Sequence, residues 1–505
     1  MSGARGGVHD LSEQAKARFF PHDLDDDWRS PDLGRFGETA SSSARRLLSA
    51  CEALWRADAE EGRDLENGSV YAGTCGAALL LYKLAMMTND DPASDAGNES
   101  PGVARDASHE RGVFFGKKRD LLVRALSFCR TASAALHAGR VGPTGRHEHE
   151  PLSFLEGEAG AHAVTAAVHF ALGDVERAEA CARRLAALRD RVMAAPKEDC
   201  ELLYGRCGYL HALLFARRRG LDATRRDEIL PVSLFASVAA QVVEEGLAND
   251  RAENENENEN ENASRAPRLA HAWRGKRYLG AAHGACGIVT TLLQCSEEFG
   301  DAVFQSDERA PSLRVFFQTN CSDATRQKAA LDETLSRLLA SSFADGNLPS
   351  SESSKAGNAL VQWCHGAPGL VVLLAQRLRA ATDETKTGMS RAFLAHRIRV
   401  ASECVWRRGL TKKGPGLCHG ASGNGYALLV AARAVKPVDP VAGRLLEARA
   451  KRFALWVSEN AIELASKHAD NPGSLFEGLA GAVAFVADAA RDPTYAWFPG
   501  SEAPD

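Results

Sequence analysis

A Gly-x-x-Gly turn recurs seven times along this chain of 505 residues, and a short apolar run compatible with a helix follows each copy. Longer amphipathic segments separate the copies. Glycine permits positive φ angles and close backbone approach at such a turn. The repeating unit is therefore an amphipathic helix, a loop and a Gly-x-x-Gly turn that opens an apolar helix. The glycine pairs are Gly73/Gly76, Gly157/Gly160, Gly205/Gly208, Gly284/Gly287, Gly366/Gly369, Gly420/Gly423 and Gly478/Gly481.

The repeat runs without a clear break, which favours one large repeat domain over several separate ones. We expect this domain to span residues 43–499, between a partly disordered N-terminal arm at 1–42 and a C-terminal tail at 500–505. The second of three expected insertions contains a strict Glu-Asn alternation, which cannot bury a core and should be disordered. The insertions are expected at residues 88–118, 249–268 and 299–322.

Charge and cysteine usage exclude several classes of protein. The net charge is −5 with acidic and basic residues well mixed, so nothing indicates nucleic-acid binding. The twelve cysteines form no tight framework and no secretory signal opens the chain, which favours free thiols in the cytoplasm. No apolar run reaches the ~18–20 residues that a membrane span needs.

Two positions of the turn carry different kinds of residue. The residue before the second glycine is always small, which indicates tight packing. The residue before the first glycine is mostly polar and titratable. If the turns gather at one end of a closed ring of helices, that position directs chemistry at a common centre. Its occupants are Ala72, Glu156, Tyr204, His283, His365, His419 and Glu477.

Two turns place a Cys-His pair before the first glycine: Cys364-His365 and Cys418-His419. Cysteine thiolate and imidazole are preferred ligands of zinc. Four ligands would close a structural site, whereas three ligands and water would leave a catalytic one open, and spacing does not decide between them. The alternative is two buried cysteines and two hydrogen-bonded histidines. His283 occupies the same position without a cysteine, which fits an acid–base role as well as a structural one.

Six motifs of the chain fall at or beside the repeated turns: Leu203-Tyr204-Gly205-Arg206, Tyr278-Leu279-Gly280-Ala281-Ala282-His283-Gly284, Trp363-Cys364-His365-Gly366, Lys412-Lys413-Gly414, Cys418-His419-Gly420 and Ser474-Leu475-Phe476-Glu477-Gly478. Through them the chain resembles the eukaryotic LanC-like (lanthionine synthetase C-like) family, relatives of the bacterial lantibiotic cyclases. This resemblance implies an all-α fold, an α/α toroid of seven inner and seven outer helices. It also implies one zinc ion held by Cys364, Cys418 and His419 with the fourth position open, and it implies that His365 is not a ligand.

The chemistry that the resemblance implies is zinc-dependent addition of a thiol, from glutathione as co-substrate, to dehydroalanine or dehydrobutyrine in a protein or peptide. A free thiol has a pKa of ~8.5, and zinc coordination deprotonates it. His283 matches the position that the family uses for proton transfer. The residues expected to contact glutathione are Lys413, Lys467, Asp470 and Arg18.

Two other functions stay open at this point, and a third is disfavoured because zinc ligands would be superfluous for it. The chain could be a non-catalytic glutathione- and zinc-binding scaffold for signalling partners, or a lanthipeptide cyclase acting on a precursor peptide. A glycosidase on a similar helical barrel would need a carboxylate pair, for which Glu156 and Glu477 are the candidates. We expect a cytoplasmic protein, with peripheral association at the plasma membrane left open.

Overall fold

Seven buried helices begin at the Gly-x-x-Gly turns, each with the first glycine of the pair as its N-cap. The computed structural model describes residues 12–21, 24, 33, 35–63, 67–88, 115–138, 151–254, 266–305, 323–381, 389–491 and 493–504. Within these ranges the only strand-like pairings are isolated β-bridges, and the all-α fold class is confirmed. The inner helices are α4 (Thr74–Met86), α6 (Glu158–Ala171), α9 (Arg206–Arg219), α13 (Ala285–Phe299), α16 (Ala367–Ala380), α18 (Ala421–Val435) and α20 (Leu479–Ala489).

A second set of helices alternates with them along the chain and buries mainly one face. Helix α7, for example, buries Ala178, Cys181, Ala182 and Leu185 and exposes its charged residues. The outer helices are α3 (Phe36–Glu60), α5 (Lys118–His137), α7 (Val175–Ala187), α11 (Val232–Asn254), α15 (Asp323–Ala340), α17 (Arg391–Arg408) and α19 (Pro440–His468). Shorter elements are α1 (Glu13–Lys16), α8 (Arg189–Ala194), α10 (Arg226–Ile229), η4 (Gly300–Phe304) and η5 (Pro493–Tyr495).

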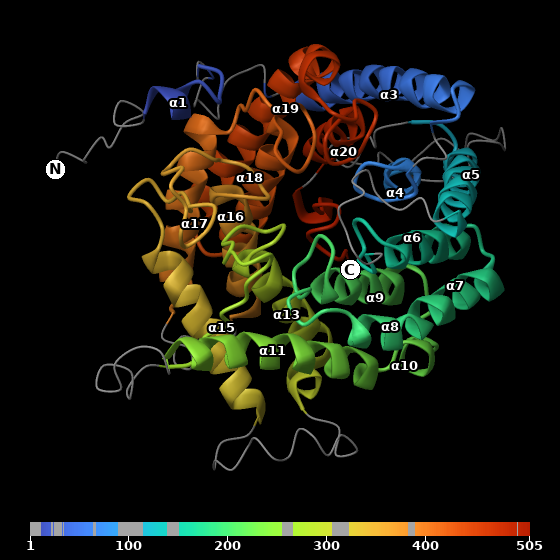
Figure 1. Ribbon diagram of the computed structural model, residues 1–505. Coiled ribbons are helices and arrows are strands. Elements are labelled where there is room, and N and C mark those ends of the chain that lie inside the picture. Colours follow the sequence, from blue (N-terminus) through green and yellow to red (C-terminus); the bar gives the residue numbers. More distant parts are fainter. Residues whose placement is uncertain are drawn as a thin grey trace, which may run out of the picture.

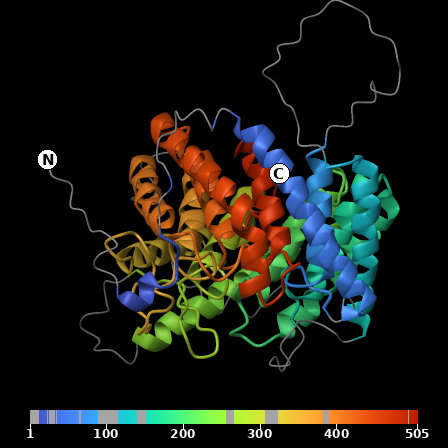
Figure 2. The same ribbon diagram turned by 90° about the horizontal axis from the view of Figure 1, so that it is seen from above.

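The inner helices form a closed ring. Each contacts the next along the chain, and α20 contacts α4, which closes the circle. The outer helices pack against the outside of this ring, as Figure 1 shows. Helix α3 lies along α19 and α20, so the first outer helix packs against the last repeat (Figures 1 and 2). The result is an α/α toroid.

The glycines are required because the chain passes over each turn at very short range. A Cβ atom added at Gly423 would lie 1.9 Å from the carbonyl oxygen of Leu417. Gly366 also has a φ of 123°, a conformation that side chains other than hydrogen disfavour. The six-residue loop before each inner helix therefore folds back onto the start of that helix. This contact holds the residue before the first glycine at the N-terminal end of the ring.

The expected insertions and arm are partly helical where they are described. Residues 249–254 belong to α11, and residues 299–305 include the end of α13 and η4. Residues 89–114, 255–265 and 306–322 lie outside the described residues. In the N-terminal arm, the backbone N–H of Phe20 donates to Leu410 O at 2.8 Å. No helix in the described part of the chain is both long and apolar enough to cross a membrane.

The described part of the C-terminal tail, residues 500–504, is buried inside the ring. The red C-terminal segment lies toward the centre of the toroid in Figure 1. Trp363 Nε1 donates to Ser501 Oγ at 3.1 Å, and Gln294 donates to the Ser501 carbonyl at 2.9 Å. The Glu502 carboxylate forms ion pairs with Arg433 and Arg379, near the C-terminal ends of two inner helices. The tail therefore fills the axis of the toroid and reaches the loop that precedes α16.

We predict that Glu502→Gln lowers the free energy of unfolding by about 3 kcal/mol, because two arginines lose the charge of a buried partner. Burial raises the pKa of Glu502, but the charges of Arg433 and Arg379 outweigh it and the net pKa is lowered. The contribution is therefore present above the unfolded pKa of ~4.3 and is lost as the pH falls through the lower folded value.

Urea denaturation at pH 7 and at about pH 4 measures this effect. Glu463→Gln is the matched control, because Glu463 pairs with Lys467 on the exposed surface and should leave unfolding unchanged. Equal stability of the Glu502 and Glu463 variants at pH 7 would show that the tail does not support the ring.

Candidate functional site

Three loops at the N-terminal end of the ring are joined by backbone hydrogen bonds. Cys364 N donates to Cys418 O at 3.2 Å, and Cys418 N donates to Phe476 O at 2.8 Å. The loops that precede α16, α18 and α20 are therefore held in register with one another. This register fixes the relative positions of the side chains that precede the first glycines.

Cys364, Cys418 and His419 form a compact donor cluster. Two sulfur atoms and one ring nitrogen all lie within 4.8 Å of one another, and all three residues are buried. Burial, followed by the neighbouring Cys364, raises the pKa of Cys418 well above its usual value. A bound cation would offset both effects, and a set of two thiolates and one imidazole suits zinc. The residues present therefore fit the metal that the resemblance implies, with a fourth position left for another ligand.

His365 stands next to this cluster but is not part of it among the described residues. Burial lowers the pKa of His365 to about 4, and the charges of His283, Lys413 and His419 act in the same direction. The ring is therefore neutral at pH 7. Its Nδ1 atom is buried and has no hydrogen-bond partner in the described structure.

His283 is held by a carboxylate that the sequence patterns did not reveal. Its Nδ1 lies 3.2 Å from Oε2 of Glu201, a residue with only 1% of its side chain exposed. The Glu201 carboxylate also accepts the N–H groups of Leu203 at 2.6 Å and Tyr204 at 2.7 Å. Because this carboxylate acts as an acceptor, the His283 Nδ1 carries the proton and Nε2 is the free basic nitrogen.

Comparison of the loops explains how Glu201 could have been found. Four residues before the first glycine, other loops carry a serine whose hydroxyl accepts the N–H three residues later. Ser153 and Ser474 do this at 3.1 and 3.2 Å. Glu201 closes the same turn with Oε1, and its Oε2, which also accepts the Leu203 N–H, lies within hydrogen-bond distance of His283. A charged residue at a position held by serine in other copies is the signal that sequence reasoning missed.

Aromatic rings cover one face of His283. Trp273 stacks on it with ring centroids 4.0 Å apart and an interplanar angle of 4°. Tyr204 stacks nearly parallel on both rings, and Tyr278 packs between His283 and His365. These rings restrict the orientation of His283 to the plane set by Glu201. They also limit the access of water to the imidazole.

The carboxyl group of Glu156 behaves differently from an ordinary surface acid. Burial raises its pKa to about 8, with further contributions from the charges of Glu477 and Glu201. Glu477 accepts a hydrogen bond from Asn471 at 2.6 Å. Glu156 is therefore largely protonated at pH 7.

A cationic cavity of about 240 Å³ opens beside the loop that carries Cys364. Arg18 and Lys413 both line it, so the structure brings these two expected glutathione contacts together. Their proximity depends on backbone pairing of the arm, because Lys412 N donates to Arg18 O at 3.0 Å. Gln362, which also lines the cavity, donates to Cys364 Sγ at 3.3 Å.

Lys467 and Asp470 are placed differently. Lys467 pairs with Glu463 on the surface with 61% of its side chain exposed, and neither Lys467 nor Asp470 lines the cavity. His468 lies on the cavity wall instead. The segment reaches the cavity at the C-terminal end of α19, and there His468 lines the cavity while its neighbour Lys467 does not.

Comparisons with known proteins identify one family. A family model described as "Lanthionine synthetase C-like protein" matches residues 64–501. The chain is 31% identical over 350 residues to Glutathione S-transferase LANCL1 of Danio rerio, covering 69% of this chain and 73% of that protein. It is 32% identical over 305 residues to LanC-like protein GCL1 of Arabidopsis thaliana, covering 60% of this chain and 57% of that protein.

Among solved structures, nisin cyclase is similar in fold. The TM-score is 0.53, and the match covers 88% of this chain and 94% of that one. The sequences are 12% identical, so this likeness concerns the fold alone.

We predict that the purified protein binds about one zinc ion per chain. Cys418→Ala or Cys364→Ala should remove it, because each variant keeps only two of the three clustered donors. His365→Ala and Cys286→Ala should retain it, since Cys286 is an equally buried cysteine outside the cluster. Elemental analysis of the four variants measures the metal directly. Loss of metal from His365→Ala would show that the site has four protein ligands.

Proposed function

Because this chain belongs to the lanthionine synthetase C-like family, we propose that it adds the thiol of glutathione to dehydroalanine or dehydrobutyrine in proteins or peptides, with zinc as cofactor. The family match and the names of the relatives support an enzyme. The observation that carries the proposed substrate and cofactor is the donor cluster of two cysteines and one histidine, together with the His283–Glu201 pair.

The chemistry needs a thiolate, a proton acceptor and a proton donor. Addition forms a bond between the thiol sulfur and the β-carbon, and the α-carbon receives a proton as the double bond is lost. Zinc, when bound, supplies the positive charge that keeps an incoming thiol in its thiolate form. His283 Nε2 takes up the thiol proton and can return a proton to the α-carbon, while Glu201 stabilises the charged imidazole.

The cationic cavity supports glutathione as the thiol. Glutathione carries two carboxylates, and Arg18 and Lys413 place two positive charges on the wall of one cavity. The cavity adjoins the Cys364 loop through Gln362, so a peptide bound there has its sulfur close to the donor cluster. The positive charge of Lys413 also reaches the centre, since it contributes to the lowered pKa of His365.

The scaffold alternative differs in what it needs from the site. A protein that only binds glutathione and zinc has no use for an imidazole locked by a buried carboxylate and an aromatic stack. Glu201 holds His283, whereas in other loops a serine at the same position is enough to close the turn. The cyclase alternative keeps the same chemistry and differs only in taking the thiol from the acceptor peptide itself.

The central prediction is that the protein joins glutathione to a dehydroalanine-containing peptide, and that a zinc chelator abolishes the reaction. Mass spectrometry of the peptide measures the addition of one glutathione, and calorimetry measures glutathione binding. Binding without any addition would support the scaffold. Reaction only with a cysteine inside the same peptide, and not with glutathione, would support the cyclase.

We predict that His283→Asn lowers the rate of addition by about 10²–10⁴-fold, the usual contribution of a positioned acid–base group. Zinc content and glutathione affinity should stay close to wild type, because His283 is outside the donor cluster. Elemental analysis, calorimetry and turnover on one preparation separate these effects.

Two companion variants sharpen this experiment. Glu201→Gln should lower the rate less than His283→Asn and should shift the pH dependence, because a neutral amide no longer stabilises the charged imidazole. Tyr278→Phe leaves the imidazole and its carboxylate in place and controls for disturbance of the aromatic cover. Equal loss of metal, glutathione binding and turnover in His283→Asn would make His283 a structural residue.

A further inference from the structure

Helix α6 differs from most inner helices in having a polar stripe that is not fully buried. Every residue of α4 except Met86 is buried, and so is every residue of α20. In α6, Glu158, His162 and Thr165 remain partly exposed, and His169 continues the same face. The spacing of four, three and four residues places all four side chains on one side of the helix. An inner helix therefore presents a polar face outward between two outer helices.

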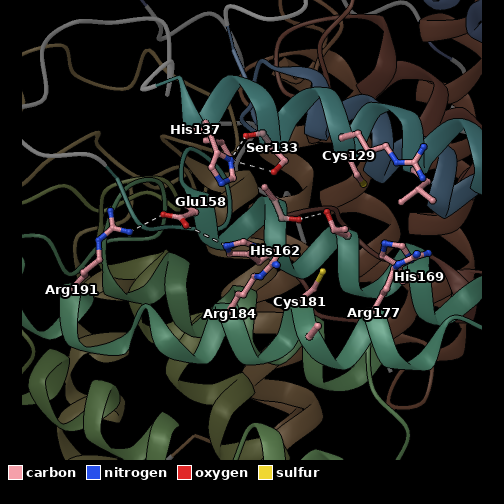
Figure 3. A pocket seen from close by; sticks show the side chains of 16 residues that line it. Cys129, Ser133, His137, Glu158, His162, His169, Arg177, Cys181, Arg184 and Arg191 are labelled. Atoms are coloured by element: carbon pink, nitrogen blue, oxygen red, sulfur yellow. Dashed lines mark hydrogen bonds and ion pairs between the residues drawn. The ribbon is translucent and has the colours of Figure 1, made fainter.

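This face forms the floor of a cleft of about 640 Å³ between α5 and α7 (Figure 3). The volume lies in the range typical of small-molecule sites. The cleft is on the outer wall of the toroid and shares no lining residue with the cationic cavity beside the Cys364 loop. It is therefore a separate site from the one proposed for glutathione.

The cleft is strongly positive although the chain as a whole carries −5. Four arginines and one glutamate line it, which leaves a formal charge of +3 when its three histidines are neutral. The negative charge of Glu158 is already paired within the protein, with Arg191 at 2.8 Å and His162 at 3.3 Å (Figure 3). The hydrogen bond with His162 and the contact with Arg191 lower the pKa of Glu158 to about 2.

Two further arginines line the two walls of the cleft, Arg130 from α5 and Arg184 from α7. Neither forms an ion pair or a hydrogen bond with the described residues. Arg177, by contrast, is paired with Asp174 at 2.9 Å. The charge of Arg130 is felt at the floor of the cleft, because it adds to the effect of burial in lowering the pKa of His169. The cleft thus has unneutralised guanidinium groups on two opposite walls.

We propose that this cleft binds a small molecule that carries two or more phosphate groups. Guanidinium groups pair with phosphate oxygens in a bidentate manner, and one group on each wall fits a ligand with more than one anionic group. The histidines of the floor and of α5 add hydrogen-bond donors. Among the described residues that line the cleft, histidine is the only aromatic type, so we take the phosphate groups as the feature that the arginines recognise.

Calorimetry with inorganic tripolyphosphate at physiological ionic strength tests this proposal on the full chain. Wild type should bind the probe in a saturable manner, with sulfate and citrate weaker by about tenfold or more because they lack multiple phosphates. The double variant Arg130→Gln/Arg184→Gln should weaken binding by at least about tenfold. Ala180→Trp, which fills the cleft and leaves every charge in place, should weaken it as well.

Arg183→Gln is the matched control, since Arg183 is the exposed neighbour of Arg184 on α7 and does not line the cleft. It should bind the probe like wild type, and all variants should add glutathione and bind zinc like wild type. The proposal fails if wild type does not bind tripolyphosphate or if citrate binds equally well. It also fails if Arg183→Gln weakens binding as much as the double variant, which would indicate a diffuse surface charge.

Discussion

The close approach of each loop to the start of its helix determines the rest of this structure. At Gly423 there is no room for a Cβ atom, because the Leu417 carbonyl lies where it would stand. Any other residue there would push the loop away from the ring and move the side chain before the first glycine with it. The inner helices form the ring, and these loop contacts bring the ligand atoms of Cys364, Cys418 and His419 to within 4.8 Å of one another. The geometry of the site is thus a consequence of backbone contact.

Much of this arrangement was predictable because the repeat is encoded locally. The Gly-x-x-Gly spacing and the apolar run after it predict the buried helices, and the doubled Cys-His pair predicts where soft ligands meet. Glu201 was not predicted, since it stands at a serine position in a single loop and its partner His283 is 82 residues away in sequence. Local sequence patterns identify the repeated positions. The role of a residue that differs in one copy becomes clear only when the three-dimensional structure shows its partner.

Long-range contacts account for most of what the sequence did not reveal. The C-terminal tail is short and mixed in composition, so its burial depends on arginines contributed by helices that close a ring around it. The pairing of Arg18 with the Lys413 loop depends on a backbone bridge between the arm and a loop far along the chain. The polar face of α6 is visible in the sequence, but its exposure follows from how α5 and α7 pack. Each of these depends on where distant helices lie.

Burial at the centre of the ring opposes negative charge on its acidic groups. Glu156 lies at the N-terminus of α6, and a helix N-terminus favours an anion by about 0.3–1 kcal/mol, up to ~2 kcal/mol where partly buried. Burial nevertheless raises the pKa of Glu156 to about 8 from a usual value near 4.5. That shift corresponds to roughly 5 kcal/mol against the charged form, which exceeds the contribution of a helix end. Cys418 is equally buried and lies beside a second thiol, and both effects raise its pKa. A divalent cation held by the three converging donors would offset that cost.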